Sequence, residues 1–155
     1  MLLVTPGSLK TEHAELRATL ARAVRESGPI GAAARELNDL LQPHLAKEDL
    51  FALPPLALLP YLAEGQVIAS MADAVALAGQ LKNRLDELLR EHRDIQAALH
   101  RLIEAAKADD RVEYAEFAYR LINHAQMEDQ VLYPAAILVG EFLKLKLGTA
   151  ASPGA

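Results

Sequence analysis

The sequence contains no cysteine among its 155 residues, and it has no tryptophan. The absence of cysteine excludes disulfides, thiolate metal ligands, iron–sulfur clusters and a cysteine nucleophile, so that His, Asp and Glu remain as the available metal ligands. Aromatic residues make up only 5% of a chain that is 52% hydrophobic. This composition, rich in Ala and Leu, favours helices and argues against a β-sandwich or a β-barrel.

Long hydrophobic runs and an excess of positive charge are missing as well. The longest apolar run, residues 50–63, contains three prolines and is too short to span a bilayer. The first seven residues lack the basic start of a signal peptide. The net charge is −5 and no basic stripe is present, which argues against nucleic acid. We therefore expect one cytoplasmic domain with neither a membrane nor a nucleic acid as its partner.

One short phrase occurs twice. The pattern H-x-x-x-E-D-x-x-x-x-P occupies residues 44–54 and again residues 124–134, 80 residues later. In a helix, residues four apart lie on one face, about 40° and about 6 Å from one another. Each phrase therefore presents an imidazole above a carboxylate, and this pair of donors suits iron, zinc or manganese.

Apolar residues recur at helical spacing through most of the chain. The pattern predicts helices over residues 8–26, 29–52 and 67–108, with Gly79 as a possible break in the third. A fourth helix, capped by Asp109 or Asp110, runs to residue 132, and a short helix covers residues 135–147. We expect a disordered tail at residues 148–155.

The repeat extends beyond the two phrases. His13 and His92 lie in the apolar stripes of the first and third helices, 79 residues apart. Each half of the chain thus supplies one histidine from its first helix and a His–Glu pair from its second. Two such hairpins predict an all-α fold, an antiparallel up-down four-helix bundle with a short C-terminal helix. Counting residues from each turn brings all four histidines to one level of the bundle.

Six ionisable residues in apolar seams are hard to explain without a ligand. A lone histidine in such a stripe is usually an ordinary core residue, but a buried unpaired carboxylate is very costly. Four imidazoles and two carboxylates satisfy two metal ions if both carboxylates bridge. The predicted metal ligands are His13, His44, Glu48, His92, His124 and Glu128.

This pattern resembles the hemerythrin-like domains, also called HHE cation-binding domains. The resemblance covers about residues 8–134 and rests on the paired phrases and on the two further histidines. It implies a hemerythrin-like domain over residues 1–147 that holds two iron ions in an oxo- or hydroxo-bridged di-iron centre. The four histidines would be terminal ligands, and Glu48 and Glu128 would bridge.

Other polar residues near the phrases are assigned weaker roles. Oxygen-carrying hemerythrins have a further histidine four residues after the one that matches His92, where this chain has Gln96, which argues against simple reversible oxygen carriage. His100 lies about 80° off the seam and is excluded. We expect Tyr133 to anchor the end of the bundle, with a hydrogen bond from its hydroxyl to the site as the alternative. Four carboxylates are interpreted as parts of solvated helix faces, and the alternative is that they orient the ligand imidazoles from outside the site. They are Glu12, Asp49, Glu91 and Asp129.

Three functions fit these residues. The first, which we favour, is a protein that binds or senses O₂, NO or peroxide at a di-iron site, or handles iron, without a catalytic residue or an organic cofactor. The second is a di-iron oxidase or peroxidase with the same ligands. The third is an interaction module that a metal such as zinc only stabilises. The region around residues 67–79 and the apolar 50s loop could form a homodimer surface, although packing within one chain is the simpler interpretation.

Overall fold

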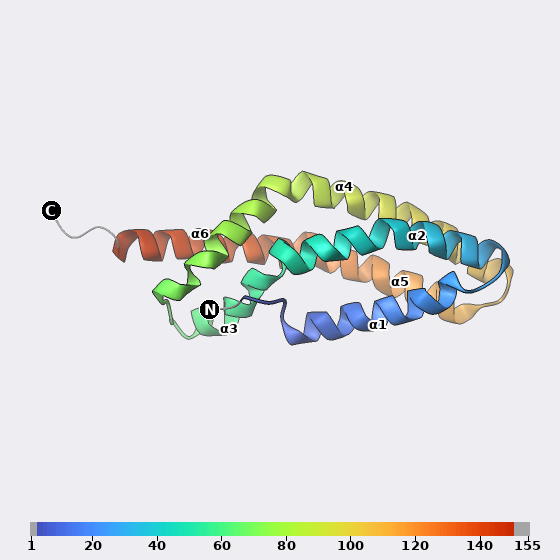
Figure 1. The fold of residues 1–155 in the computed structure, drawn as a ribbon, viewed down its shortest axis with the longest axis horizontal. Coiled ribbons are helices and arrows are strands. Elements are labelled where there is room, and N and C mark those ends of the chain that lie inside the picture. The colour runs from blue at the N-terminus through green and yellow to red at the C-terminus, as the bar shows by residue number, and fades with distance from the viewer. Residues whose placement is uncertain (1–2, 151–155) are drawn as a thin grey trace.

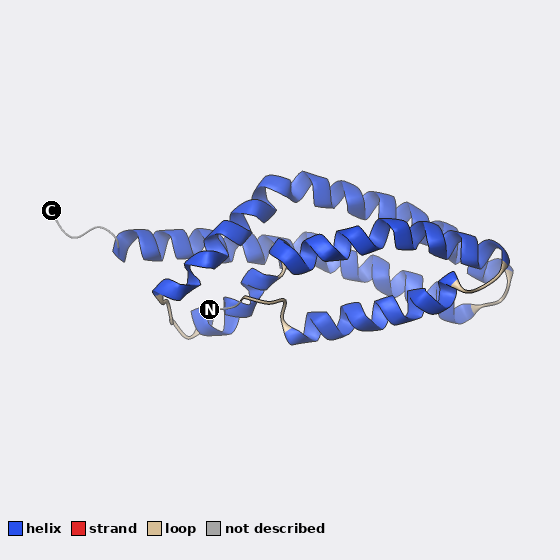
Figure 2. Ribbon diagram, in the orientation of Figure 1, coloured by secondary structure: helices blue, strands red, loops and turns tan. Residues whose placement is uncertain are grey.

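The computed structural model describes residues 3–150, and these residues form helices and connecting turns without a strand (Figure 2). The predicted all-α class is confirmed. Four long helices run side by side along the length of the molecule (Figure 1). They are α1 (Gly7–Val24), α2 (Gly28–Lys47), α4 (Asp73–Ala108) and α5 (Val112–Met127).

Two tight turns at one end of the molecule make the two hairpins, α1–α2 and α4–α5 (Figure 1). Gly28 has a φ of +67°, a left-handed conformation that glycine adopts without steric cost and that reverses the chain before α2. In the second turn Asp110 has a φ of +52°, and Arg111 precedes α5. The cap of α5 is therefore Arg111 and neither of the two aspartates that we predicted.

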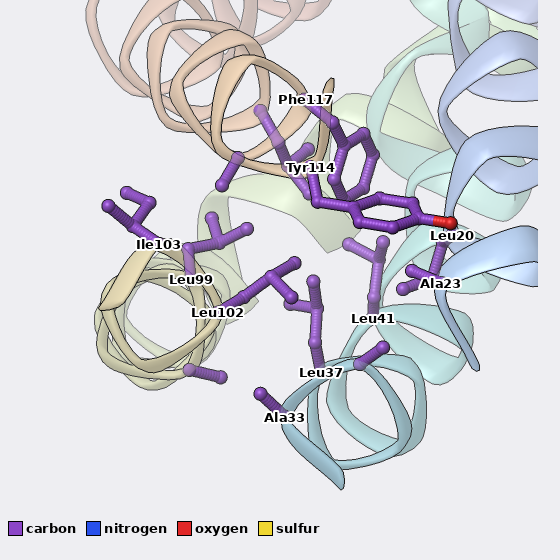
Figure 3. Packing of buried hydrophobic residues seen from close by; sticks show 14 of the residues in the cluster. Leu20, Ala23, Ala33, Leu37, Leu41, Leu99, Leu102, Ile103, Tyr114 and Phe117 are labelled. Carbon is purple, nitrogen blue, oxygen red and sulfur yellow. The ribbon is translucent and has the colours of Figure 1, made fainter. Parts of the chain in front are cut away.

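The half of the bundle next to these turns is filled by apolar side chains from all four long helices (Figure 3). The predicted stripes supply most of them, and each is at most 3% exposed. Burying side chains of this size is the main stabilising contribution in such a bundle. Among them are Leu16, Leu20, Leu37, Leu41, Leu99, Leu102, Tyr114, Phe117 and Leu121.

The connection between the hairpins consists of short helical turns. They are η1 (Glu48–Ala52), η2 (Pro54–Leu58), α3 (Leu59–Ala63) and η3 (Ala69–Ala72). The first of these is a π-turn, and a second π-turn, η4 (Glu128–Leu132), follows α5. Each π-turn therefore begins at the glutamate of a repeated phrase. Sequence periodicity did not predict these π-turns, although π-turns inside helices are frequent at functional sites.

Two predicted boundaries are wrong, and the possible break at Gly79 does not occur. Helix α4 begins at Asp73 and not at residue 67, because the residues before it form the 3-10 turn η3. Helix α4 continues through Gly79, because Ala78 and Leu81 beside it are buried and their packing outweighs a glycine cost of about 1 kcal/mol. The C-terminal helix α6 (Tyr133–Ala150) is longer than predicted and continues directly from η4 (Figure 1). Of the predicted tail, residues 148–150 belong to α6 and residues 151–155 lie outside the described residues.

Helix α6 packs against the first half of α4 at close range. A Cβ atom at Gly140 would lie 2.4 Å from the Cβ of Ala78, so the two backbones approach where both residues are small. Val139 and Leu143 on α6 are buried in the same contact with Ala74. None of the helices in the described part of the chain is both long and apolar enough to cross a membrane.

Candidate metal centre

The structure brings all six predicted ligand residues together in the core. Helix α1 supplies His13 and helix α4 supplies His92. A His–Glu pair comes from the junction of α2 with η1, and another from the junction of α5 with η4. Their side chains lie between the apolar cluster near the hairpin turns and a second apolar cluster that contains Phe51, Leu88 and Tyr133. Each of the six residues is between 0% and 6% exposed: His13, His44, Glu48, His92, His124 and Glu128.

The first group of donors contains His44 and His92. Their Nε2 atoms are 2.8 Å apart, and the Nε2 of His44 is 3.2 Å from Glu48 Oε1. The Nε2 of His92 is 3.2 Å from Glu128 Oε2. Ligand atoms about 2.1 Å from a single ion lie about 3 Å from their neighbours in an octahedral arrangement. These four atoms therefore have the spacing that one metal ion requires.

The second group contains His13 and His124. Their Nε2 atoms are 3.1 Å apart, and the Nε2 of His124 is 2.7 Å from Glu128 Oε1. The Nε2 of His13 is 3.6 Å from Glu48 Oε2 and 3.7 Å from Glu128 Oε1. Each glutamate thus turns one oxygen toward each group. Two ions, one in each group, would share both carboxylates.

The chemistry of the donors fits a metal better than it fits a hydrogen-bonded core. His44 and His92 each donate a hydrogen bond from Nδ1 to an outer carboxylate, which leaves a lone pair on each Nε2. Two lone pairs 2.8 Å apart repel unless a cation, a proton or a metal ion, lies between them. In addition, Glu48 Oε2 and Glu128 Oε1 are buried, and although imidazole nitrogens lie close to both, neither oxygen accepts a hydrogen bond of good geometry. The residues present therefore fit a bound pair of cations.

In the absence of metal, protons take up this role. Burial lowers the pKa of His44, but the hydrogen bond and charge of Glu48 outweigh it and raise this pKa to about 9. The pKa of His124 is raised to about 9 in the same way by Glu128. For Glu128, burial opposes ionisation, yet hydrogen bonds from the surrounding imidazoles hold its pKa well below the usual range. Burial raises the pKa of Glu48, because this carboxylate has fewer imidazole partners than Glu128 to offset the effect of burial.

The four outer carboxylates are not merely solvated, contrary to our first interpretation. His44 Nδ1 donates to Glu91 at 2.7 Å, and His92 Nδ1 donates to Asp129 at 2.6 Å. The sequence ranked this role second, because each carboxylate lies off the seam of its own helix but beside an imidazole of a neighbouring helix. Such partners fix the tautomer and orientation of ligand imidazoles. The other two are Glu12, 3.0 Å from His124 Nδ1, and Asp49, 3.8 Å from His13 Nδ1.

Tyr133 belongs to the centre, whereas we predicted it to anchor the bundle end. Its hydroxyl donates a hydrogen bond to Glu48 Oε1 and lies 3.3 Å from His92 Nε2. In an α-helix a residue five positions after Glu128 would point about 140° away from it. The π-turn takes up one extra residue, with the Tyr133 N–H bonded to the Glu128 carbonyl, and so brings the tyrosine to the same side.

Two surface hollows reach the outer sides of two imidazoles. One, of about 240 Å³ between α4 and α5, is lined by His92, Asp129 and Gln96 among others. The other, of about 350 Å³, is lined by Glu12 and His124 among others. Gln96 is exposed in the first hollow, and no described contact joins it to the six donors. His100 is exposed, which agrees with its exclusion.

Comparison with known proteins agrees with this geometry. Residues 7–136 match the sequence model of the hemerythrin HHE cation-binding domain, and this match covers most of the chain. Neither the curated proteins nor the solved structures include a match to the chain. The match spans both hairpins, both repeated phrases and Tyr133. The chain therefore belongs to the hemerythrin HHE cation-binding domain family.

Proposed function

We propose that this protein binds two iron ions in its core and uses them to bind a small ligand, namely O₂, NO or peroxide. The observation that carries the proposal is the convergence of six buried donors into two groups that share Glu128, with Glu48 in the first group and its Oε2 3.6 Å from His13 of the second. The metal ligands are His13, His44, Glu48, His92, His124 and Glu128.

The donor set supports iron. Each group offers two imidazole nitrogens and carboxylate oxygens, a combination that suits iron, zinc and manganese, and the chain contains no thiolate to favour a softer site. Iron held there supplies a redox-active centre to which O₂, NO or peroxide can bind. Family membership supports a cation in this position.

The protein residues around the donors orient them and keep water out. Glu91 and Asp129 hold the rings of His44 and His92 with their Nε2 atoms facing the centre. Tyr133 holds one oxygen of Glu48 through its hydroxyl proton. Apolar clusters lie on both sides of the centre, so that its groups interact in a medium of low polarity. These residues would limit access to molecules of a few atoms.

The test is metal analysis and absorption spectroscopy of protein purified from iron-supplemented cells, followed by titration with NO and with peroxide. We expect two irons per chain, near-ultraviolet charge-transfer bands and spectral changes that saturate with either ligand. His44→Ala and Glu128→Ala should lose the iron and the bands. His100→Ala is the matched control, because His100 is exposed and outside the six donors; it should behave like the wild type.

The other outcomes are equally informative. A colourless protein with two zinc ions would contradict the proposal and indicate a metal that only stabilises the bundle. Iron that remains bound in both alanine variants would show that the site lies elsewhere. Sustained consumption of peroxide or O₂, many times the amount of protein, would indicate a di-iron oxidase or peroxidase.

A further inference from the structure

The internal repeat of the chain relates the two groups of donors, because each histidine of one group has its counterpart in the other. The first group contains His44 and His92, and the second contains His124 and His13, their counterparts at offsets of 80 and 79 residues. Each group takes one histidine from each hairpin. The two groups thus contain the same kinds of imidazole donor, but both glutamates lie within ligand range of the first group and only Glu128 lies within range of the second. Residues outside the six donors add to this difference.

Tyr133 is one such difference. Its hydroxyl contacts Glu48 Oε1 and lies 3.3 Å from His92 Nε2, and both of these atoms belong to the first group. Its ring stacks on the ring of His92, with centroids 5.6 Å apart and an angle of 13° between the planes. The repeat places Leu53 at the corresponding point of the first hairpin. Leu53 is also fully buried, but its side chain has no donor atom.

The outer carboxylates are a second, independent difference. In the first group both histidines donate from Nδ1, at 2.7 Å to Glu91 and at 2.6 Å to Asp129. In the second group the Nδ1 of His124 is 3.0 Å from Glu12 Oε1, and the Nδ1 of His13 is buried without a hydrogen-bond partner.

The reason for the unpaired nitrogen lies in the surroundings of Asp49. This carboxylate accepts a hydrogen bond of 3.0 Å from Thr5 and contacts Arg17 at 3.5 Å. It remains 3.8 Å from His13 Nδ1, whereas its counterpart Asp129 bonds His92 directly. The second group therefore has one imidazole, His13, whose Nδ1 no hydrogen bond to a carboxylate orients.

Building on the proposed function, we propose that the two metal positions are unequal. The His44–His92 position binds its ion first and more tightly, with the Tyr133 phenol oxygen as a fifth donor. The His13–His124 position is the weaker one. Oriented imidazoles lose less freedom when a metal binds, and an additional oxygen donor strengthens the first position further. A ferric ion in this position would be held by the Tyr133 oxygen as a phenolate, and the phenol proton would be released to solvent.

The test is a titration of the metal-free protein with Co²⁺, whose absorption reports on coordination. We expect two steps of one ion each, with affinities at least about tenfold apart, the scale on which supporting groups change metal affinity. Tyr133→Phe should weaken the first step and bring the two affinities together. In the ferric protein the same variant should lose a visible phenolate-to-iron band. Tyr119→Phe is the matched control, because Tyr119 is 47% exposed and lies outside the centre.

Two further variants keep the test decisive if Tyr133→Phe folds poorly. His13→Ala should retain the tighter step, and His44→Ala should lose it. The reverse result, or a Tyr133→Phe protein with the unchanged steps and the unchanged visible band, would overturn this inference. Two Co²⁺ ions that bind in a single step of equal affinity would also overturn it while leaving the proposed function intact. A protein that binds no metal would overturn the proposed function itself, and this inference with it.

Discussion

The two halves of the bundle bury different kinds of side chain. Near the hairpin turns, leucines and aromatic rings from four helices pack against one another in an apolar cluster (Figure 3). One step along the same helices, six ionisable side chains are equally buried. The first layer is complete without a ligand. The second contains opposed lone pairs and orphaned carboxylate oxygens that only cations can satisfy.

This comparison separates the residues that make the fold from those that make the site. The same α-helical seam carries both kinds, since Leu37 and Leu41 precede His44 on one face of α2. A substitution in the apolar layer should therefore affect stability, whereas a substitution in the ionisable layer should affect metal binding. Four predictions test this separation.

The largest effect should come from Glu128→Ala. Glu128 contacts donors of both groups, namely His92, His124 and His13, so its loss should prevent both ions from binding. Metal analysis after equilibration with iron measures this directly. Glu116→Ala, an exposed position on the same helix, should bind two ions. Two ions retained in Glu128→Ala would show that this carboxylate is not shared.

Leu99→Ala should have the converse effect. Leu99 is fully buried in the apolar layer, and truncation of such a leucine costs about 2–5 kcal/mol of unfolding free energy. Denaturant unfolding of the metal-free protein checks the loss of stability, and metal analysis checks that two ions still bind. A variant that keeps its stability but loses metal would contradict the separation of the two layers.

Asp129→Asn should weaken metal binding by about 10- to 100-fold, because Asp129 orients His92 from 2.6 Å. Asp49→Asn should have a smaller effect, since Asp49 is 3.8 Å from His13 and is bonded to Thr5 instead. Competition with a chelator of known affinity compares the two variants. Equal effects would mean that the difference between the two carboxylates has no consequence for the metal.

The effect of pH should be gradual. His44 and His124 have pKa values raised from 6.5 to about 9, so each stabilises the metal-free fold while it is protonated. This stabilisation is complete below about pH 6.5 and is lost as the pH rises to about 9. Metal affinity should increase over the same range, because the ion no longer has to displace protons. Thermal unfolding and metal titration at a series of pH values test the two opposite trends.

Much of the fold follows from α-helical periodicity alone. The stripes that contain Leu16, Leu99 and Leu121 predict the four long helices, and the repeat predicts their arrangement in two hairpins. The positions of the four histidines at one level follow from the lengths of the helices. These features depend on regular geometry, which a sequence expresses directly.

The rest depends on irregular geometry or on neighbouring helices. The π-turns at Glu48 and Glu128 shift every later residue, and for this reason Val131, three residues after Glu128, is 50% exposed while Tyr133 enters the centre. The outer carboxylates act across helices, so no single helix reveals them. Helix α4 passes Gly79 without a break because packing outweighs local propensity.

The central claim, two ions held between the two groups of donors, is tested most directly by X-ray diffraction from iron-loaded crystals at the iron absorption edge. We predict two anomalous peaks in the core, one between His44 and His92 and one between His13 and His124, with both glutamates between them. Peaks at any other place, or no peak in crystals of iron-loaded protein, would contradict the account.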